Sequence, residues 1–275
     1  MPRQIPDAVA ETLKTLREYR VRIMVAGFSG WPDAGSVSTL AVGYLKDKLD
    51  AEKLWEISGQ GFYDLTSTRP YVRIRAGLLI DLKLPSTELY LWRSPMRDKA
   101  ILILLGGEPS LDWESYVERV LEVCEAAGVG RIYLIGGVLD SVPHTRTPKI
   151  TAVANMEHLR KELRVLDLTP SDYNGPSSIH SYLMFKARER GVEALGLWGH
   201  APSYISMPNA RVALHVLRKL VGMLGIELDM GELEERAEEL EEEVNRMMSE
   251  NLELQRLVRA LEMSYDRERG PSYIS

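Results

Sequence analysis

The sequence predicts an α/β fold in which a mainly parallel sheet carries helices on both faces and is followed by a C-terminal helical extension. Continuous apolar segments such as residues 99–105 are typical of strands covered on both sides. These segments alternate along the chain with amphipathic segments of helical length, and right-handed connections between parallel strands place such helices on both faces of a sheet. Near the C-terminus the composition becomes rich in glutamate, and leucine, replaced by methionine at 247, recurs every seven residues from 233 to 261, which predicts helices there.

The first strand and the loop after it form the part of the chain around which we expect the fold to be organised. Residues 21–28 are an apolar segment, residues 36–49 have the pattern of a helix, and Gly30 and Gly35 lie between them. Glycine permits positive φ angles and close approach of the backbone, so the loop can present amide hydrogens to an anion or a carbonyl. Ligands of open α/β sheets bind beyond the carboxyl ends of the strands, which places this loop at a functional edge.

The other elements follow from local patterns. Val9, Leu13 and Leu16 at helical spacing predict a short helix over residues 8–19, and a second strand is expected at 53–58. Short segments rich in β-branched and aromatic residues predict an antiparallel or edge part of a sheet at 71–74, 77–82 and 88–92. The strands expected at 99–105 and 131–135 both end in two glycines. Further strands are expected at Ile150–Ala154, 164–168 and 194–198, and further helices at Trp113–Ala127, 156–163, 177–190 and 209–224.

The chain is expected to contain an α/β domain over residues 1–228, a helical extension over 229–263 and a tail over 264–275. The heptad pattern of the extension includes one polar residue, Asn251. It leaves two arrangements open: one long helix that pairs with a second copy, or a turn near residues 249–252 with two helices that pack on each other or on the core. For pairing between copies, the predicted oligomerisation residues are Leu233, Leu240, Val244, Met247 and Leu254.

Composition narrows the class of function. The net charge of −6 comes with interspersed basic and acidic residues, so no footprint for nucleic acid is present and we expect no nucleic-acid partner. No apolar segment approaches the roughly 20 residues that span a bilayer, and no targeting segment is recognised. The single cysteine, Cys124, cannot form an internal disulfide, which favours a reducing compartment. We therefore expect a cytoplasmic protein without a membrane association.

Polar residues that follow predicted strand ends define a candidate edge for a ligand or a protein partner. Two consecutive strand ends with paired glycines put their loops at the same edge as the first loop. The residues expected there are Gly30, Trp31, Asp33, Glu108, His144, Thr145, Arg146, Tyr173, Ser177, His200 and Tyr204. No nucleophile elbow, P-loop or dinucleotide turn is present, and the five histidines lack metal-ligand spacing, so we expect neither a cofactor nor a metal.

Two interpretations of this edge stay open. A mixed set of acid, base and histidine beside a glycine-lined loop suits a hydrolase or phosphorylase pocket, in which Glu108, His144 and Arg146 would do the chemistry. The structural interpretation has Asp33 and Ser177 as helix caps and Arg146 paired with Glu108. We favour the structural interpretation, and we also expect His180 to be a packed residue within its helix.

Six ordered motifs resemble the prokaryotic branch of the proteasome assembly chaperone 2 family. They are GFSGWPDAG at 27–35, GGEPSLDW at 106–113, PHTR at 143–146, YNGPSSI at 173–179, LWGHAPSYISMP at 197–208 and VRALE at 258–262. Ser178 stands where the family has glycine, and Ser203 where histidine is usual. The motifs run from the first strand to near the end of the chain, and their joint occurrence in this order is specific.

The resemblance implies a fold like that of purine nucleoside phosphorylases, without an established enzyme activity. It implies self-association, and in some members a role in assembling or activating the 20S proteasome. Activator-type members end in a hydrophobic residue, tyrosine and any residue. This chain departs from that ending, because Tyr273 is third from the end and Ile274 is penultimate.

The function predicted from the sequence is therefore a proteasome assembly chaperone-like protein, a self-associating scaffold that binds proteins without catalysis. Its expected partners are a second copy of itself and proteasome subunits or related assembly factors. The alternative is a hydrolase- or phosphorylase-like enzyme, or a small-ligand binder, that uses the loop edge of the sheet.

Overall fold

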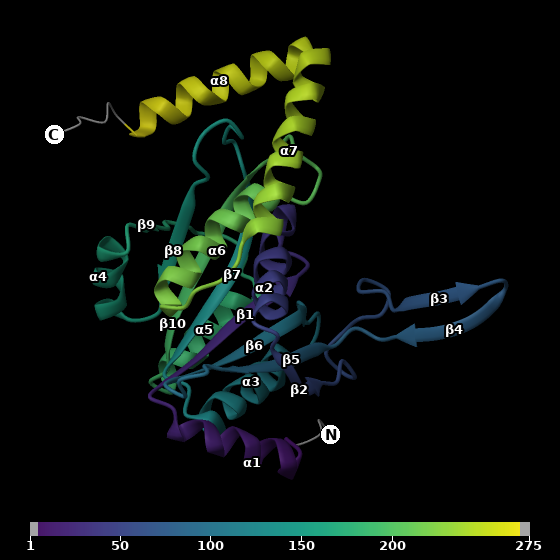
Figure 1. The fold of residues 1–275 in the computed structure, drawn as a ribbon, viewed down its shortest axis with the longest axis vertical. Coiled ribbons are helices and arrows are strands. Elements are labelled where there is room, and N and C mark those ends of the chain that lie inside the picture. The colour runs from purple at the N-terminus through teal and green to yellow at the C-terminus, as the bar shows by residue number, and fades with distance from the viewer. Residues whose placement is uncertain (1–4, 270–275) are drawn as a thin grey trace.

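The computed structural model describes residues 5–269, and its centre is an eight-stranded sheet (Figure 1). In order across the sheet, the strands are β2 (Glu52–Ile57), β5 (Thr87–Arg93), β6 (Lys99–Gly107), β1 (Val21–Ser29), β7 (Arg131–Asp140), β10 (Glu193–Pro202), β8 (Ile150–Ala154) and β9 (Thr169–Pro170). The four central strands, β6, β1, β7 and β10, are parallel, whereas β5 and β8 run antiparallel to their inner neighbours. The predicted α/β fold with a mainly parallel sheet is thus confirmed.

Helices cover both faces of the sheet because successive side chains of each central strand point to opposite sides. In β1, Ile23 and Val25 face a core shared with α2 (Val37–Lys48), α4 (Glu157–Val165), α6 (Ala210–Leu224) and α7 (Gly231–Glu250). Met24, Ala26 and Phe28 face a second core shared with α1 (Asp7–Thr15), α3 (Trp113–Ala127) and α5 (Ile179–Glu189). Short 3₁₀ helices, η1 (Leu16–Glu18) and η2 (Ala34–Ser36), lie on either side of β1.

One predicted strand is wrong. Residues 164–168 form the end of α4 and the turn after it instead of a strand. Leu159 and Leu163 lie at helical spacing in the core, and Leu168 reaches the same core only after the helix has ended at Val165. Of the apolar residues in the predicted strand, only Leu168 is buried and Val165 is 85% exposed, so the apolar composition of this segment indicated neither a strand nor its burial.

The segment between β2 and β5 contains a feature that the sequence did not separate from the main sheet. The strands β3 (Tyr71–Arg75) and β4 (Leu78–Lys83) form their own two-stranded sheet, which projects from the body as an arm (Figure 1). Of the three segments expected in an antiparallel or edge part of a sheet, only 88–92 joins the main sheet, as β5 between β2 and β6.

The C-terminal extension is two helices joined by a sharp turn, which is the second of the two predicted arrangements. Helix α7 ends at Glu250, Asn251 has extended backbone angles, and α8 (Leu252–Arg269) crosses back over the loops at the top of the sheet (Figure 1). Helix α8 thus continues past residue 263, where the extension was expected to end. The residues after 269, including Tyr273 and Ile274, lie outside the described part of the chain.

The predicted oligomerisation residues differ in how far their own chain buries them. Leu233 and Val244 are buried within their own chain, and Leu240 and Leu254 are half-buried. Among these five residues, only Met247 is exposed, at 42%. Within residues 5–269, no helix is long and apolar enough to cross a bilayer.

Candidate functional site at the carboxyl edge of the parallel strands

Most of the predicted site residues lie beyond the carboxyl ends of the four central parallel strands, whereas His200 lies within β10, and Tyr173 and Ser177 follow β9. These ends are Ser29 of β1, Gly107 of β6, Asp140 of β7 and Pro202 of β10. The loops that follow them bring most of the predicted residues to one edge of the sheet. The residues do not form one cluster, however, because they divide into separate groups with different partners.

The loop after β1 is fixed by its own backbone and by β7. The carboxylate of Asp33 accepts hydrogen bonds from the backbone N–H of Thr39 at 3.0 Å and from the Thr39 hydroxyl at 2.7 Å. Burial raises the pKa of Asp33 in spite of these bonds. Gly35 has a φ of 61°, and the N–H of Gly137 donates to the carbonyl of Pro32 at 2.8 Å. Asp33 therefore stabilises the first turn of α2, as the structural interpretation expected.

Glu108 holds together three segments that are distant along the chain. Its Oε1 accepts a hydrogen bond from the backbone N–H of Ile179 at 2.9 Å, at the first turn of α5, and its carboxylate also accepts from the N–H of Trp31. Burial outweighs these bonds and raises the pKa of Glu108. The expected cap by Ser177 is wrong, since the Ser177 hydroxyl donates to the carbonyl of Ser178 instead. The carboxylate of Glu108, which comes from another loop, thus accepts the hydrogen bond at the start of α5 that was expected for Ser177.

A hollow of about 320 Å³ lies beside Glu108. It is lined by Ser29, Gly30, Trp31, Thr68, Gly107, Glu108, Pro109, Ser110 and Trp113. Trp31 is 57% exposed at its margin, and the indole N–H of Trp113 donates to the carbonyl of Pro109 at 2.6 Å.

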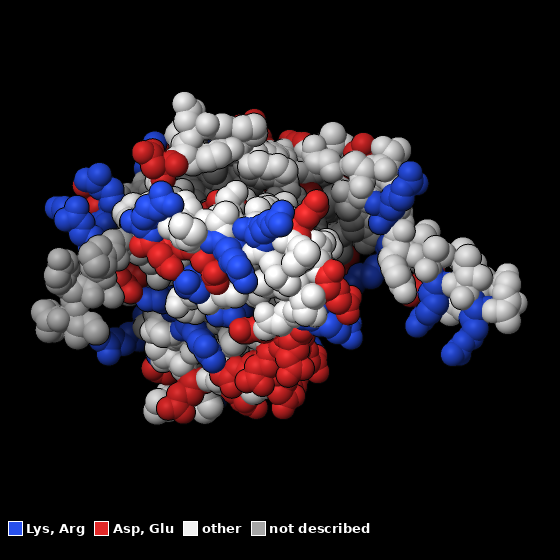
Figure 2. Space-filling view, turned by 90° about the horizontal axis from the view of Figure 1, so that it is seen from above, with Lys and Arg blue, Asp and Glu red and all other residues white. Residues whose placement is uncertain are grey.

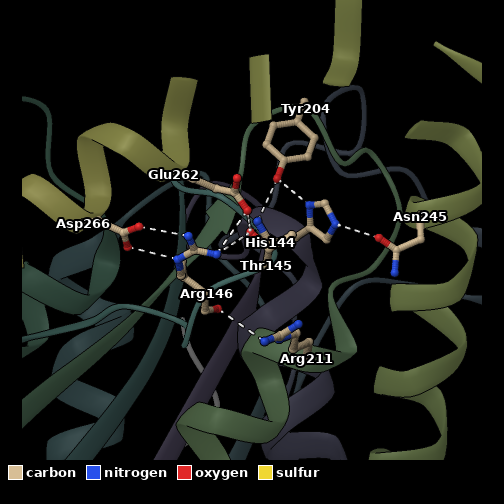
Figure 3. A network of polar contacts seen from close by, with 8 residues as sticks. All are labelled: His144, Thr145, Arg146, Tyr204, Arg211, Asn245, Glu262 and Asp266. Atoms are coloured by element: carbon tan, nitrogen blue, oxygen red, sulfur yellow. Dashed lines mark hydrogen bonds and ion pairs between the residues drawn. The ribbon is translucent and has the colours of Figure 1, made fainter. Parts of the chain in front are cut away.

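His144 belongs to a second group, which joins the loop after β7 to the C-terminal helices (Figure 3). Its backbone N–H donates to the hydroxyl oxygen of Tyr204 at 2.7 Å, and its ring Nδ1 lies 2.7 Å from the same oxygen. On the other side of the ring, Nε2 lies 3.5 Å from Oδ1 of Asn245 in α7. Burial lowers the pKa of His144 and raises that of Tyr204 to about 12, so both side chains are neutral near pH 7. His144 is thus held between a strand-end loop and α7.

Arg146 binds α8 through two carboxylates. Its Nε and Nη2 atoms donate to the two oxygens of Asp266 at 3.0 and 2.9 Å, and its Nη1 donates to Oε1 of Glu262 at 3.1 Å (Figure 3). Thr145 donates its hydroxyl to the same Glu262 oxygen, and the Tyr265 hydroxyl donates to the carbonyl of Thr147 at 2.7 Å. The expected pairing of Arg146 with Glu108 is therefore wrong. We call His144, Thr145, Arg146, Tyr204, Asn245, Glu262, Tyr265 and Asp266 the loop–helix network.

The remaining predicted residues take no part in the hydrogen bonds described for these two groups. The ring of His200 bridges Asp140, at 2.7 Å from Nδ1, and Thr151, at 2.9 Å from Nε2. Burial lowers the pKa of His200 although Asp140 opposes this change. Tyr173 is 66% exposed, and its hydroxyl donates to the carbonyl of Pro176 within its own turn.

The space left inside the loop–helix network is small. A cavity of about 20 Å³ lies next to His144, Arg146 and His200 and is closed on one side by Glu241 and Val244 of α7. Such a volume is close to what one water molecule occupies. Among the described residues, no group of three or more His, Cys, Asp or Glu side chains is placed to hold a metal ion. The network therefore presents a closed polar contact between loop and helices instead of a substrate pocket.

Sequence reasoning missed the partners that α7 and α8 supply to this network. Asn245, Tyr265 and Asp266 were not selected, because their pattern is that of an ordinary solvent-facing helix surface. The signal that could have found them is the motif at 258–262, whose Val258 is buried and whose Glu262 faces Arg146.

The fold and the site define a class of protein: a parallel α/β domain whose strand-end loops are covered by two C-terminal helices. Comparison with known protein families identifies the family to which the chain belongs. The family model of the PAC2 family matches residues 27–248, and the chain belongs to this family.

Solved structures agree with this assignment. A PAC2 family protein from Streptomyces avermitilis is 29% identical, with a TM-score of 0.77 and coverage of 86% of this chain and 99% of that one. A proteasome-assembly chaperone homologue from Mycobacterium tuberculosis is 28% identical, with a TM-score of 0.78 and coverage of 86% and 99%. PbaB from Pyrococcus furiosus, an archaeal proteasome activator, shares the fold at 23% identity, with a TM-score of 0.67 and coverage of 90% and 97%.

Proposed function

We propose that this protein is a proteasome assembly chaperone-like scaffold that associates with itself and binds proteasome subunits or related assembly factors. The proposal is supported by membership of the PAC2 family and by the similarity to the M. tuberculosis proteasome-assembly chaperone homologue over most of both chains. One structural observation carries it. The polar side chains of the loop–helix network, which an enzyme would direct at a substrate, bind the chain's own C-terminal helices.

The surface proposed for the partner includes two exposed aromatic side chains. Trp31 follows the end of β1, and Tyr173 lies in the segment between β9 and α5; they are 57% and 66% exposed. Large aromatic side chains contribute much of the binding energy at protein interfaces when a partner covers them. Exposed aromatic residues beside loops that are rigidly fixed suit a pre-organised surface for another protein.

The test is binding of purified proteasome α and β subunits from the source organism, followed by native mass spectrometry and by the rate of 20S assembly. We expect a complex of defined composition and faster assembly. The double variant Trp31→Ala/Tyr173→Ala should weaken the complex while the melting temperature stays the same. The matched control is Met96→Ala, an 85% exposed side chain between β5 and β6 at the opposite edge of the sheet. Absence of any complex with either class of subunit would refute the proposed partner.

The enzyme alternative requires Glu108, His144 and Arg146 to act together. Glu108 instead accepts hydrogen bonds from two backbone N–H groups, and Arg146 is bound by Glu262 and Asp266 on α8. A hydrolase or phosphorylase activity that disappears in a folded Arg146→Ala variant would favour this alternative over the scaffold.

A small-ligand binder remains the second candidate because of the hollow beside Glu108. Its volume of about 320 Å³ lies at the lower end of the size range of ligand pockets. The test is a thermal-shift screen with nucleosides, inorganic phosphate and sugar phosphates. A ligand of this hollow should raise the melting temperature of the wild type and lose its effect in Ser110→Trp, which places a large side chain at a position that lines the hollow. No shift beyond buffer controls would remove this candidate.

A further inference from the structure

The hollow beside Glu108 is lined by a carboxylate that no basic side chain neutralises. Among the described residues, Glu108 accepts hydrogen bonds from the backbone N–H groups of Ile179 and Trp31, and no Lys, Arg or His pairs with it. The half-buried Glu88, by contrast, pairs with Lys53 at 2.8 Å. A carboxylate offers about four lone-pair sites, so Glu108 keeps both acceptor capacity and negative charge for a further group.

Two indole rings and three hydroxyl groups line the hollow together with this carboxylate. The rings belong to Trp31 and Trp113, and the hydroxyls belong to Ser29, Thr68 and Ser110. Within residues 5–269, none of these three hydroxyls makes a hydrogen bond. The face of a tryptophan ring attracts an ammonium group, and a hydroxyl oxygen can accept a hydrogen bond from it. The lining therefore suits a positively charged ligand that carries N–H donors.

The same lining disfavours an anion. None of the described lining residues is Lys, Arg or His. The backbone N–H groups of Glu108 and Ser110 donate to the carbonyls of Ser29 and Phe62, each at 2.8 Å, and that of Trp31 donates to the Glu108 carboxylate. The amide hydrogens that the sequence offered to an anion thus bind groups of the chain itself.

The charge of the whole chain favours the same sign of ligand. The net charge is −6, and Figure 2 shows acidic side chains gathered in one dense group on the face seen from above, whereas Lys and Arg side chains are scattered over it. The field of a negatively charged protein raises the concentration of cations near its surface and lowers that of anions. A small cation therefore approaches this molecule more readily than a phosphate does.

The walls of the hollow are fixed by hydrogen bonds within the chain. Ser29 at the end of β1 pairs with Gly107 at the end of β6, and the hydroxyl of Tyr63 donates to the Gly107 carbonyl at 2.7 Å. The indole N–H of Trp113 is held by the carbonyl of Pro109 at 2.6 Å. A site whose walls are already ordered loses less conformational entropy when a ligand binds.

We propose that this hollow binds a small organic cation, a primary amine whose ammonium group pairs with Glu108 while its apolar part lies against Trp31 and Trp113. The ammonium group donates its remaining hydrogen bonds to the hydroxyl oxygens of the lining. This inference rests on the small-ligand binder, the second candidate of the proposed function; it names the ligand class and adds organic cations to the thermal-shift screen. An ammonium group can also belong to a lysine of another protein, and the experiment separates these two sources.

The probe is putrescine, a diamine, and its uncharged analogue is butanediol, in which hydroxyl groups replace both amines. Isothermal titration calorimetry on the full chain should detect binding of putrescine and no binding of butanediol or inorganic phosphate. Putrescine should also raise the melting temperature of the wild type and lose this effect in Ser110→Trp, in which a large side chain occupies a lining position.

Three variants test the contacts that hold the cation. Glu108→Gln keeps one acceptor oxygen for the Ile179 N–H but removes the charge, so it should weaken putrescine binding about tenfold or more. Trp31→Ala removes one ring and should weaken binding about threefold. The matched control is Glu114→Gln, an exposed glutamate that follows Trp113 and does not line the hollow. Its affinity for putrescine should stay within about twofold of the wild type.

Three results would overturn the inference: no binding of putrescine, equally tight binding of butanediol, or an unchanged affinity in a folded Glu108→Gln variant. The comparison of putrescine with butanediol uses the wild type and is therefore independent of how any variant folds. Tighter binding of a lysine-containing peptide than of putrescine, also lost in Glu108→Gln, would assign the site to a protein side chain and overturn the assignment to a small cation.

Failure of this inference can be distinguished from failure of the proposed function. A nucleoside that binds in the hollow while no cation does would keep the small-ligand binder and refute the ligand class. Absence of a complex with proteasome subunits would refute the proposed partner but leave the cation site intact, since the two are measured separately.

Discussion

The Gly137→Ala variant tests whether the second glycine of the pair in β7 is required by a close backbone contact with the loop after β1. Gly137 of β7 forms a bridge with Asp33, and its N–H donates to the carbonyl of Pro32 at 2.8 Å. A Cβ atom at position 137 would lie 2.2 Å from the carbonyl oxygen of Ala34, whereas carbon and oxygen in contact stay roughly 3.3 Å apart. The loop after β1 would therefore move by about 1 Å, since the obstacle is backbone and cannot rotate away.

The expected cost follows from these contacts. Overpacking of this kind costs about 1–3 kcal/mol, and loss of the bond to Pro32 adds about 1 kcal/mol. For a chain of this length each kcal/mol lowers the melting temperature by about 2–4 °C, so the variant should melt about 4–16 °C below the wild type.

Differential scanning calorimetry measures this change, and Gly130→Ala is the matched control. A Cβ atom at position 130 has no atom within 4 Å, so the control should stay within about 0.5 kcal/mol of the wild type. If Gly137→Ala melts at the same temperature as Gly130→Ala, the close approach of the first loop to β7 does not fix this edge and the reasoning fails.

Three further predictions concern other parts of the chain. Tyr265→Phe removes the hydrogen bond to the Thr147 carbonyl, which is worth about 1 kcal/mol, so amide exchange in α8 should accelerate about fivefold while exchange in β1 stays unchanged; equal acceleration in both would contradict a local role. His180 lies between Phe28 and Trp198, and burial lowers its pKa to about 3. Because the unfolded chain binds this proton near pH 6.5 and the folded chain does not, stability should fall by about 1.4 kcal/mol per pH unit below that value, and His180→Leu should remove this slope in urea titrations. Gly222 lies inside α6 with open space at its Cβ, so Gly222→Ala should raise the free energy of unfolding by about 0.5–1 kcal/mol; a lower melting temperature would count against this.

The sheet could be predicted from the sequence because its determinants are local. Residues 99–105 are apolar enough to require cover on both faces, and β6 is buried there at all but its ends. The glycines at 106–107 lie at the end of β6, where a Cβ at Gly106 would meet the carbonyl oxygen of Ser86 at 2.5 Å. The glycines at 136–137 lie inside β7, which continues to Asp140, so the strand end expected at residue 135 was placed too early. Local composition thus determined which segments become strands but not where each of them ends.

The partners of the site residues could not be predicted in the same way. Arg146 contacts residues more than 110 positions away, and nothing in its own segment distinguishes Asp266 from Glu108 as a partner. The projection of the arm from the main sheet could not be predicted either, because β3 and β4 have ordinary strand composition. Only the three-dimensional arrangement shows that both of their faces lie in solvent, whereas β2 and β5 on either side of them join the main sheet.

The strength with which α8 covers the loop after β7 depends on apolar burial more than on its ion pairs. The side chains of Arg146 and Asp266 are 37% and 54% exposed, and exposed pairs contribute little and are screened by salt. Val258 and Tyr265 are 1% and 7% exposed, and burial of one such apolar side chain stabilises by about 2 kcal/mol. Val258→Ala should therefore accelerate amide exchange in α8 about thirtyfold, whereas about 1 M NaCl should change it by less than about threefold. The reverse order of these two effects would show that the ion pairs hold α8, and the loop–helix network would then open in high salt.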